Sequence, residues 1–278
     1  MTAFDESIRR RTRLTGGSIN ITERIEIPAG TYVRKSRPEA PPGFFQAEAG
    51  GLRALAARAG LFIVPAVVAC GNDVDAFLLL EDLGDGAAVP DFDARLGAGL
   101  AALHRDSAHQ FGFERDNFCG LTPQRNLWTT SWVEFYRDQR LGFQQSLAVE
   151  RGLLSATDAR RLDKLRERLG DWIAEPPTGP SLIHGDLWPG NVHTTRDGLP
   201  ALIDPAVSYS HREAEFGMMS LFGGFPPQVF DAYQAAWPLE AGWQERVPLY
   251  ELYHLLNHLN LFGGGYHGQA LRVVSRFV

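Results

Sequence analysis

The sequence predicts an α+β fold with two lobes, a small N-terminal antiparallel sheet plus one helix and a larger, mainly helical C-terminal lobe. Residues 1–83 contain several short strand-like segments and one helical segment, whereas residues 84–278 contain long segments in which apolar residues recur at helical spacing. A chain of 278 residues is long enough for one large domain or two modest ones. We therefore expect a boundary after residue 83.

The N-terminal lobe is predicted to begin with a short helix that leads into a β-hairpin. Residues 19–27 show a largely two-residue apolar rhythm, and a Pro-Ala-Gly turn joins them to a second strand over 31–35. Residues 44–60 place apolar side chains near one stripe and are predicted to form a helix. The apolar runs LFIVPAVVAC and AFLLLEDLG are expected to be two further strands.

The C-terminal lobe begins after a segment rich in Gly, Asp and Pro that covers residues 83–90. Helical spacing then predicts helices over residues 91–106, 130–141, 155–175 and 249–262. Residues 181–206, SLIHGDLWPGNVHTTRDGLPALIDPA, have a different pattern, which predicts strand–loop–strand–turn–strand with Arg-Asp-Gly as the hairpin turn.

Composition and charge narrow the classes of function. The chain is 44% hydrophobic and carries a net charge of −6, which excludes disorder as the main state and argues against a general nucleic-acid binder. One basic cluster is interpreted as a solvated face of the N-terminal helix: Arg9, Arg10, Arg11 and Arg13.

The two cysteines and the absence of long apolar runs indicate where in the cell the protein is expected. Cys70 and Cys119 lie 49 positions apart, which predicts neither a disulfide framework nor a zinc knuckle. No signal-peptide core or membrane-spanning run is visible, so we expect a cytoplasmic protein without membrane contact.

The segment HGDLWPGN carries the strongest chemical signal. An apolar run leads to Asp186, Asn191 follows five positions later, and a second apolar run ends at Asp204. Phosphoryl transfer needs a carboxylate that accepts the proton of a hydroxyl, together with oxygen ligands for magnesium. A polar hairpin with turn-forming Asp and Asn is the alternative, but this spacing favours a phosphotransferase. Trp188 and His184, in the same loop, are the candidate substrate contacts; Trp188 could equally pack the loop.

A second pair of residues fits the same chemistry. Lys35 ends a predicted strand, and Glu48 lies near the apolar stripe of the predicted helix, where a carboxylate needs a partner. A kinase uses a lysine on the nucleotide phosphates and a glutamate that orients the lysine. The alternative is a solvated lysine and a rim glutamate, and a shift of one residue would put Arg34 in the place of Lys35.

A glycine pair precedes the first hairpin strand. Gly16, Gly17 and Ser18 could place backbone N–H groups over phosphates, although a plain turn is the alternative. The pattern is not a Walker loop, and no helix follows it directly, which also excludes the dinucleotide fingerprint.

Two further patterns are interpreted as structural. His104-Arg105-Asp106 spells a protein-kinase triplet, but Phe111 stands where a metal ligand would be needed, so we expect a helix end with solvated charge. His254 and His258 lie one helical turn apart; without an obvious third ligand they are interpreted as core or surface histidines.

These motifs resemble those of the fructosamine kinase (ketosamine kinase) family, relatives of aminoglycoside phosphotransferases and protein kinases. The resemblance covers nearly the whole chain and is carried by GGSIN, PPGFFQAEAGGL, TPQRNLW, HGDLWPGN, IDPA, HREAEFGM and LFGGF.

The resemblance implies a protein-kinase-like fold and an ATP- and Mg²⁺-dependent phosphorylation of a sugar hydroxyl of ketosamines, a deglycation role. It implies that Asp186 is the catalytic base and that Asn191 and Asp204 bind magnesium. ATP would lie in the cleft beside the hinge residues Glu81 and Leu83.

Some residues depart from the patterns of related kinases. Gly185 replaces the arginine of protein kinases and DPA replaces DFG, so neither a phosphorylated activation loop nor a Phe switch is expected. Ser18 stands where some family members have cysteine, so no loop disulfide is expected. Glu215 replaces the usual aspartate, a change that we expect to be tolerated.

Two other functions stay open at this point. A kinase of the same fold could act on an aminoglycoside or an amino alcohol, because the acceptor pocket is built from scattered residues. A nucleotide-binding pseudokinase is disfavoured because all three phosphoryl-transfer residues are present. The sequence predicts no oligomeric state.

Overall fold

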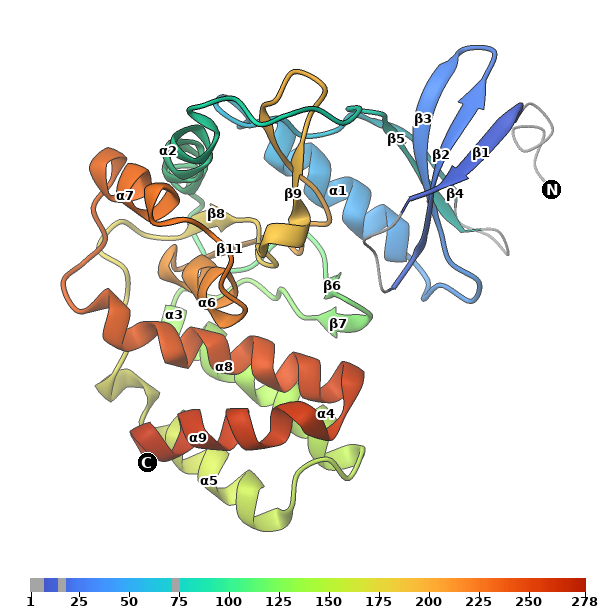
Figure 1. Ribbon diagram of the computed structural model, residues 1–278. Helices are drawn as coiled ribbons and strands as arrows, with labels where there is room; N and C mark the ends of the chain where they lie inside the picture. The colour runs from blue at the N-terminus through green and yellow to red at the C-terminus, as the bar shows by residue number, and fades with distance from the viewer. Residues whose placement is uncertain (1–7, 15–18, 72–75) are drawn as a thin grey trace.

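The computed structural model describes residues 8–14, 19–71 and 76–278 and consists of a small sheet lobe and a larger helical lobe (Figure 1). This arrangement confirms the predicted α+β fold with two lobes. The predicted glycine loop, Gly16, Gly17 and Ser18, lies outside the described residues. None of the described helices is both long enough and apolar enough to cross a membrane.

The N-terminal lobe is a five-stranded sheet in the order β1-β2-β3-β5-β4, in which every neighbouring pair is antiparallel. Helix α1 (Phe44–Ala56) packs against it through apolar side chains that include Phe45, Leu52 and Leu78. The strands are β1 (Arg10–Arg13), β2 (Ile21–Ile27), β3 (Gly30–Ser36), β4 (Val67–Gly71) and β5 (Phe77–Glu81).

Strand β1 shows that the predicted N-terminal helix is wrong for the described part of that segment. Arg10 and Arg11 lie opposite Glu26 and Ile25 of β2, and their side chains form ion pairs with Glu26 and Glu23. The basic cluster therefore lies on an exposed edge strand rather than on a helix face. Charged residues at a sheet edge discourage pairing with other chains, which gives arginines a reason to stand there.

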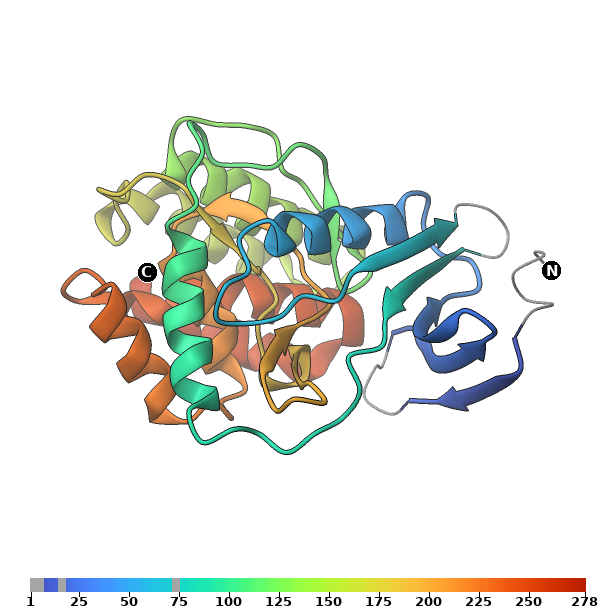
Figure 2. The ribbon, with the colours of Figure 1, turned by 90° about the horizontal axis from the view of Figure 1, so that it is seen from above.

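A linker without helix or strand joins β5 to helix α2 (Phe92–His104), and the predicted boundary after residue 83 falls within it. In Figure 2 this linker runs past the hairpin of β9 (Val192–Thr194) and β10 (Pro200–Leu202). Backbone hydrogen bonds join the two, from Arg196 N–H to the Leu83 carbonyl and from Val89 N–H to the Gly198 carbonyl. The linker is thus attached to the hairpin that leads to Asp204.

The helical lobe has two apolar cores. One lies around α8 (Trp243–Phe262), and the other lies between α2 and α7 (Pro227–Ala236). The other helical segments are α3 (Trp132–Glu134), a π-helical segment (Phe135–Gly142), α4 (Phe143–Glu150), α5 (Ala156–Glu167), α6 (Glu213–Leu221) and α9 (His267–Phe277), with short 3₁₀ turns at Leu169–Asp171, Pro189–Asn191 and Gly264–Tyr266.

The helical lobe also contains short two-stranded ladders. Strand β8 (Ser181–Ile183) pairs with β11 (Ser208–Ser210), β9 pairs with β10, and β6 (Asn117–Cys119) pairs with β7 (Thr122–Gln124). The predicted pattern over residues 181–206 is therefore confirmed, with β8 paired outside the predicted hairpin.

Candidate active site

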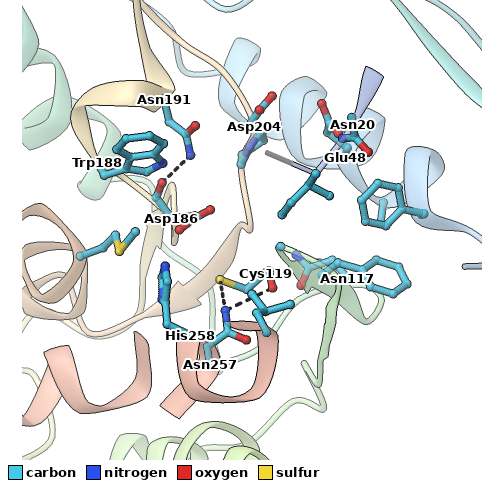
Figure 3. Close-up of a pocket in the computed structure, with 18 of the residues that line it drawn as sticks. Asn20, Glu48, Asn117, Cys119, Asp186, Trp188, Asn191, Asp204, Asn257 and His258 are labelled. Atoms are coloured by element: carbon cyan, nitrogen blue, oxygen red, sulfur yellow. Dashed lines mark hydrogen bonds between the residues drawn. The ribbon is translucent and has the colours of Figure 1, made fainter. Parts of the chain in front are cut away.

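A cavity of about 440 Å³ is lined by residues of both lobes (Figure 3). Its walls include Lys35 and Glu48 from the sheet lobe and Asp186, Asn191 and Asp204 from the helical lobe. The structure therefore brings the central residues predicted from the sequence to one place. Polar and aromatic side chains complete the lining, among them Asn20, Asn117, Cys119, Trp188, Phe222, Asn257, His258, Phe262 and Tyr266.

Lys35 contributes a buried cation to the cavity wall. Its Nζ donates a hydrogen bond to Glu48 Oε1 at 2.5 Å and another to Asp204 Oδ1, although the side chain is only 6% exposed. Burial alone would lower the pKa of Lys35, but the charges of Asp204 and Glu48 raise it. The lysine is therefore held charged between the lobes, and Glu48 has the partner that its place on the helix required.

Arg34 lies on the other face of the same strand, because successive side chains in a strand point to opposite sides. Its guanidinium lies over the ring of Phe77, 5.4 Å from the centroid, and 4.0 Å from Glu23. Lys35, and not Arg34, therefore lines the cavity.

The Asp186–Asn191 segment is a short loop with its own hydrogen bonds. The side-chain N–H of Asn191 donates to the carbonyl of Asp186 at 2.8 Å, and the backbone N–H of Asn191 donates to Trp188. Ile203 N–H then donates to the Asn191 carbonyl, so this loop is attached to the residue before Asp204. Figure 3 shows Asp186, Asn191 and Asp204 around the same part of the cavity.

Asp204 has a backbone conformation that few residues adopt. Its φ of 57° lies in the left-handed region, where a non-glycine side chain is strained. Such strain persists where the surroundings impose it, and it occurs most often at functional sites. Here the conformation accompanies a carboxylate that contacts Lys35 across the cavity.

Glu215, on α6, holds the backbone just before Asp186. Its fully buried carboxylate accepts hydrogen bonds from His184 N–H at 2.5 Å and Gly185 N–H at 3.0 Å, and it faces His104 Nε2 at 3.4 Å. Burial alone would raise the pKa of Glu215, but the His104 contact and these N–H donors lower it. The carboxylate therefore acts as an ionised anchor for the loop.

The same contact corrects the interpretation of His104-Arg105-Asp106. His104 is buried rather than solvated and also contacts the Tyr233 hydroxyl at 2.9 Å. Asp106 forms an ion pair with Arg58 at 2.7 Å and accepts a hydrogen bond from Tyr209. The triplet does end a helix, as predicted, but the packing of α6 and α7 buries the histidine.

His184 is structural in its contacts. Its Nε2 bonds to the Ile203 carbonyl at 2.8 Å, its Nδ1 accepts from Asp186 N–H, and the residue is fully buried outside the cavity lining. These bonds connect the loop of Asp186 to the segment before Asp204. The structure therefore does not bring His184 to the position predicted for a substrate contact.

Trp188 both lines the cavity and packs its own loop. It belongs to the cavity wall, and a Cβ at Gly190 would lie 2.2 Å from its ring. The loop-packing alternative is therefore seen in the structure, and the substrate contact of Trp188 stays a prediction. The predicted hinge residues Glu81 and Leu83 are not among the cavity-lining residues of the described chain; Glu81 instead accepts a hydrogen bond from Ala66 N–H.

The pKa of the Asp186 carboxyl group lies near neutral pH. Burial raises its pKa to about 7, and the negative charges of Asp204 and Glu215 act in the same direction. A carboxylate with a raised pKa can accept a proton from a reacting group more readily than an ordinary aspartate.

Sequence reasoning missed a buried polar network around Gln124. Gln124 donates to Asn117 and to the Ala206 carbonyl and accepts from the Tyr253 hydroxyl at 2.6 Å, and Asn117 donates to the Val207 carbonyl. This network holds the chain after Asp204 against α8. The only signal was the polar run in TPQRNLW, whose partners are distant in the sequence.

Helix α8 contributes further cavity residues, of which sequence reasoning had considered only His258, as a core or surface histidine. Asn257, His258, Phe262 and Leu261 all line the cavity. The His258 ring packs against Phe222 and Tyr266 with centroids 5.1 Å apart in both cases. The Asn257-His258 pair within the largely apolar stretch LLNHLNLF was the available signal.

Asn191 and Asp204 are suited to a magnesium ion. Both present side-chain oxygens at the cavity, and the amide nitrogen of Asn191 is already used by Asp186. Hard cations such as magnesium prefer this kind of ligand, supplemented by phosphate oxygens and water. The residues present therefore fit the ion that the resemblance implies.

Comparisons with known proteins show similarity over nearly the whole chain. The sequence model of the fructosamine kinase family matches residues 2–278. A relative from Enterococcus faecium that carries the name ketoamine kinase is 40% identical over 267 residues, which cover 95% of this chain and 94% of the relative.

Solved structures are similar over the same length. The crystal structure of a protein from Thermobifida fusca that carries the name fructosamine-3-kinase has a TM-score of 0.85 at 34% identity, covering 96% of this chain and 93% of that one. Aminoglycoside phosphotransferase APH(4)-Ia has a TM-score of 0.60 at 16% identity, covering 98% of this chain and 95% of that one. The second likeness shows the protein-kinase-like fold alone.

Proposed function

The chain belongs to the fructosamine kinase family, and from that premise we propose that it transfers the γ-phosphoryl group of ATP to a sugar hydroxyl of a ketosamine. The single observation that carries the proposal is the convergence of Lys35, Asp186, Asn191 and Asp204 in one cavity. The substrate is a small glycated amine, and loss of the phosphorylated sugar from it would repair the amine.

In this proposal, Asp186 takes the proton of the acceptor hydroxyl. The hydroxyl oxygen forms a bond to the γ-phosphorus, the bond from that phosphorus to the β,γ-bridging oxygen breaks, and ADP leaves. The raised pKa of Asp186 favours the proton transfer. The hydrogen bonds that the backbone N–H groups of His184 and Gly185 donate to Glu215 hold the aspartate in place.

Lys35 and Glu48 would bind the nucleotide. The charged Nζ of Lys35 is available to phosphate oxygens, and Glu48 fixes its position. Asn191 and Asp204 would hold magnesium, which when bound neutralises phosphate charge. The aromatic and polar wall formed by Trp188, His258 and their neighbours faces the same cavity and is proposed as the acceptor side.

The acceptor class is tested with a panel of hydroxylated amines. We expect ADP release with fructosyl-lysine and ribulosyl-lysine, whether free or in a peptide, and little release with aminoglycosides or choline. Unmodified lysine is the matched control, because it lacks only the sugar. Preferential turnover of an aminoglycoside would contradict the proposed substrate class, and ATP binding without turnover of any acceptor would favour a pseudokinase.

Replacing Lys35 tests the nucleotide side of the cavity. We expect Lys35→Met to lower kcat/KM for ATP about 10- to 100-fold, the equivalent of losing a charge-assisted hydrogen bond of about 1.5–3 kcal/mol. Steady-state kinetics with varied ATP measure the effect. Arg34→Met is the matched control, since that cation lies on the opposite strand face. A larger loss in the Arg34 variant than in the Lys35 variant would reverse the assignment.

A further inference from the structure

We propose that Cys119, Asp186 and His254 form a zinc-binding site at the edge of the cavity. One ligand atom from each residue lies within 4.8 Å of the other two. The three residues come from β6, from the loop after β8 and from α8, so only the folded chain brings them together. Figure 3 shows the sulfur of Cys119 on the side of that residue that faces Asp186.

The ligand types select the ion. A thiolate, an imidazole and a carboxylate form a typical zinc set, with metal–ligand distances of about 2.0–2.3 Å. Ligands of one tetrahedral ion lie roughly 3–4 Å apart, a little closer than the 4.8 Å within which these three ligand atoms lie. Magnesium prefers oxygen ligands alone, so this site is chemically distinct from Asn191 and Asp204.

An unpartnered nitrogen supports the site independently. His254 is 3% exposed, and its buried Nδ1 has no hydrogen-bond partner within the described chain. Buried polar atoms are nearly always paired, so an exception needs an explanation. Burial lowers the pKa of His254 to about 3, with the charges of His258 and Arg140 acting in the same direction, which leaves the imidazole neutral and able to bind a metal.

Access and charge balance also fit a divalent ion. Cys119 and Asp186 line the cavity, which gives an ion a path from solvent. A thiolate and a carboxylate together balance the two positive charges of zinc. The amide of Asn257 donates to Cys119 Sγ at 3.2 Å, a contact that orients the sulfur.

Zinc binding must release a proton. Burial and the charge of Asp186 raise the pKa of the Cys119 thiol, so the sulfur carries a proton when no metal is present. On binding, the sulfur–hydrogen bond gives way to a sulfur–zinc bond, and the proton passes to solvent.

The site gives zinc an inhibitory effect, an inference that rests on the proposed function. If Asp186 is the catalytic base, a zinc ion bound to its carboxylate occupies the oxygen that must receive the proton. Zinc would then stop phosphoryl transfer, and a chelator would restore it. The binding itself does not depend on what the protein phosphorylates.

Binding is tested on the full-length, reduced protein with zinc in equilibrium dialysis and with cobalt as a spectroscopic probe. We expect one zinc ion per chain and a sulfur-to-cobalt charge-transfer band. Cys119→Ser and His254→Asn should each weaken zinc binding at least about 10-fold, and Cys119→Ser should abolish the band. Cys70→Ser is the matched control, a half-buried cysteine of β4 outside the site. No zinc uptake, or uptake unaffected by both site variants, overturns the proposal.

Activity at controlled free zinc separates this inference from the proposed function. Both the zinc site and the proposed function are supported if zinc inhibits the wild-type and Cys70→Ser proteins and a chelator reverses the inhibition. The inhibition should be weaker in Cys119→Ser. If one zinc ion binds per chain at this site without inhibiting turnover, the zinc site stands, but Asp186 is not the catalytic base. If the protein shows no turnover even with a chelator present, the proposed function is wrong. The sulfur-to-cobalt band then still shows whether Cys119 binds the metal.

Discussion

The Asp186→Asn variant is expected to lower kcat by about 10²- to 10⁴-fold, the usual contribution of a general base. Asparagine keeps the size of the side chain and removes its ability to take a proton. Because Lys35, Glu48 and Asp204 remain unchanged, binding of an ATP analogue should change little. Single-turnover kinetics with a fructosyl-lysine peptide, together with a nucleotide titration, measure the two effects.

A matched control lies on the neighbouring hairpin. Asp197 is exposed in the turn between β9 and β10, and Asp197→Asn makes the same chemical change away from the cavity. We expect that variant to keep the wild-type kcat. Full activity in Asp186→Asn would show that another group accepts the proton. An equal loss of nucleotide affinity and turnover would instead assign the aspartate to binding.

The fold and the centre of the site were predictable because their signals are local. The rhythm of residues 19–27, the apolar stripe of residues 44–60 and the spacing from Asp186 to Asp204 each lie within one continuous segment. Glu48 illustrates the argument well, because a carboxylate on an apolar stripe requires a cation, and Lys35 is that cation. Such reasoning needs no knowledge of distant contacts.

The missed features depend on contacts between distant segments. Gln124 joins the chain after Asp204 to Tyr253, and His254 approaches Cys119 across more than a hundred residues of sequence. Nothing in the spacing of those residues indicates that they meet. The N-terminal strand β1 was missed for a related reason: a run of arginines has no apolar rhythm, and its pairing with β2 decides its structure.

Glu215 shows how a residue noted only as a small change becomes central in the structure. The sequence indicated that glutamate in place of aspartate would be tolerated. In the structure both of its oxygens accept backbone N–H groups of the loop that carries Asp186. The longer side chain therefore reaches its partners from α6. Its importance lies in the anchor rather than in the difference between the two acids.

Glu215→Ala is expected to destabilise the fold by about 3–5 kcal/mol, the usual cost of removing one partner of a buried charged contact. The N–H groups of His184 and Gly185 would be left buried without acceptors. Denaturant unfolding measures the loss. Because the loop of Asp186 would also lose its anchor, kcat should fall even at temperatures where the variant is folded, with KM for ATP changing less.

The Glu213→Ala variant separates the effect of losing a buried carboxylate from the effect of losing the anchor of the Asp186 loop. Glu213 is also a fully buried carboxylate of α6, but it accepts hydrogen bonds from the Arg246 side chain instead of the loop backbone. We expect it to lose stability and to keep kcat while folded. Glu215→Asp, which retains a carboxylate, should recover part of the lost turnover. If both alanine variants lost stability but kept kcat, Glu215 would stabilise the lobe without positioning Asp186, and the loop would owe its geometry to His184 and Asn191.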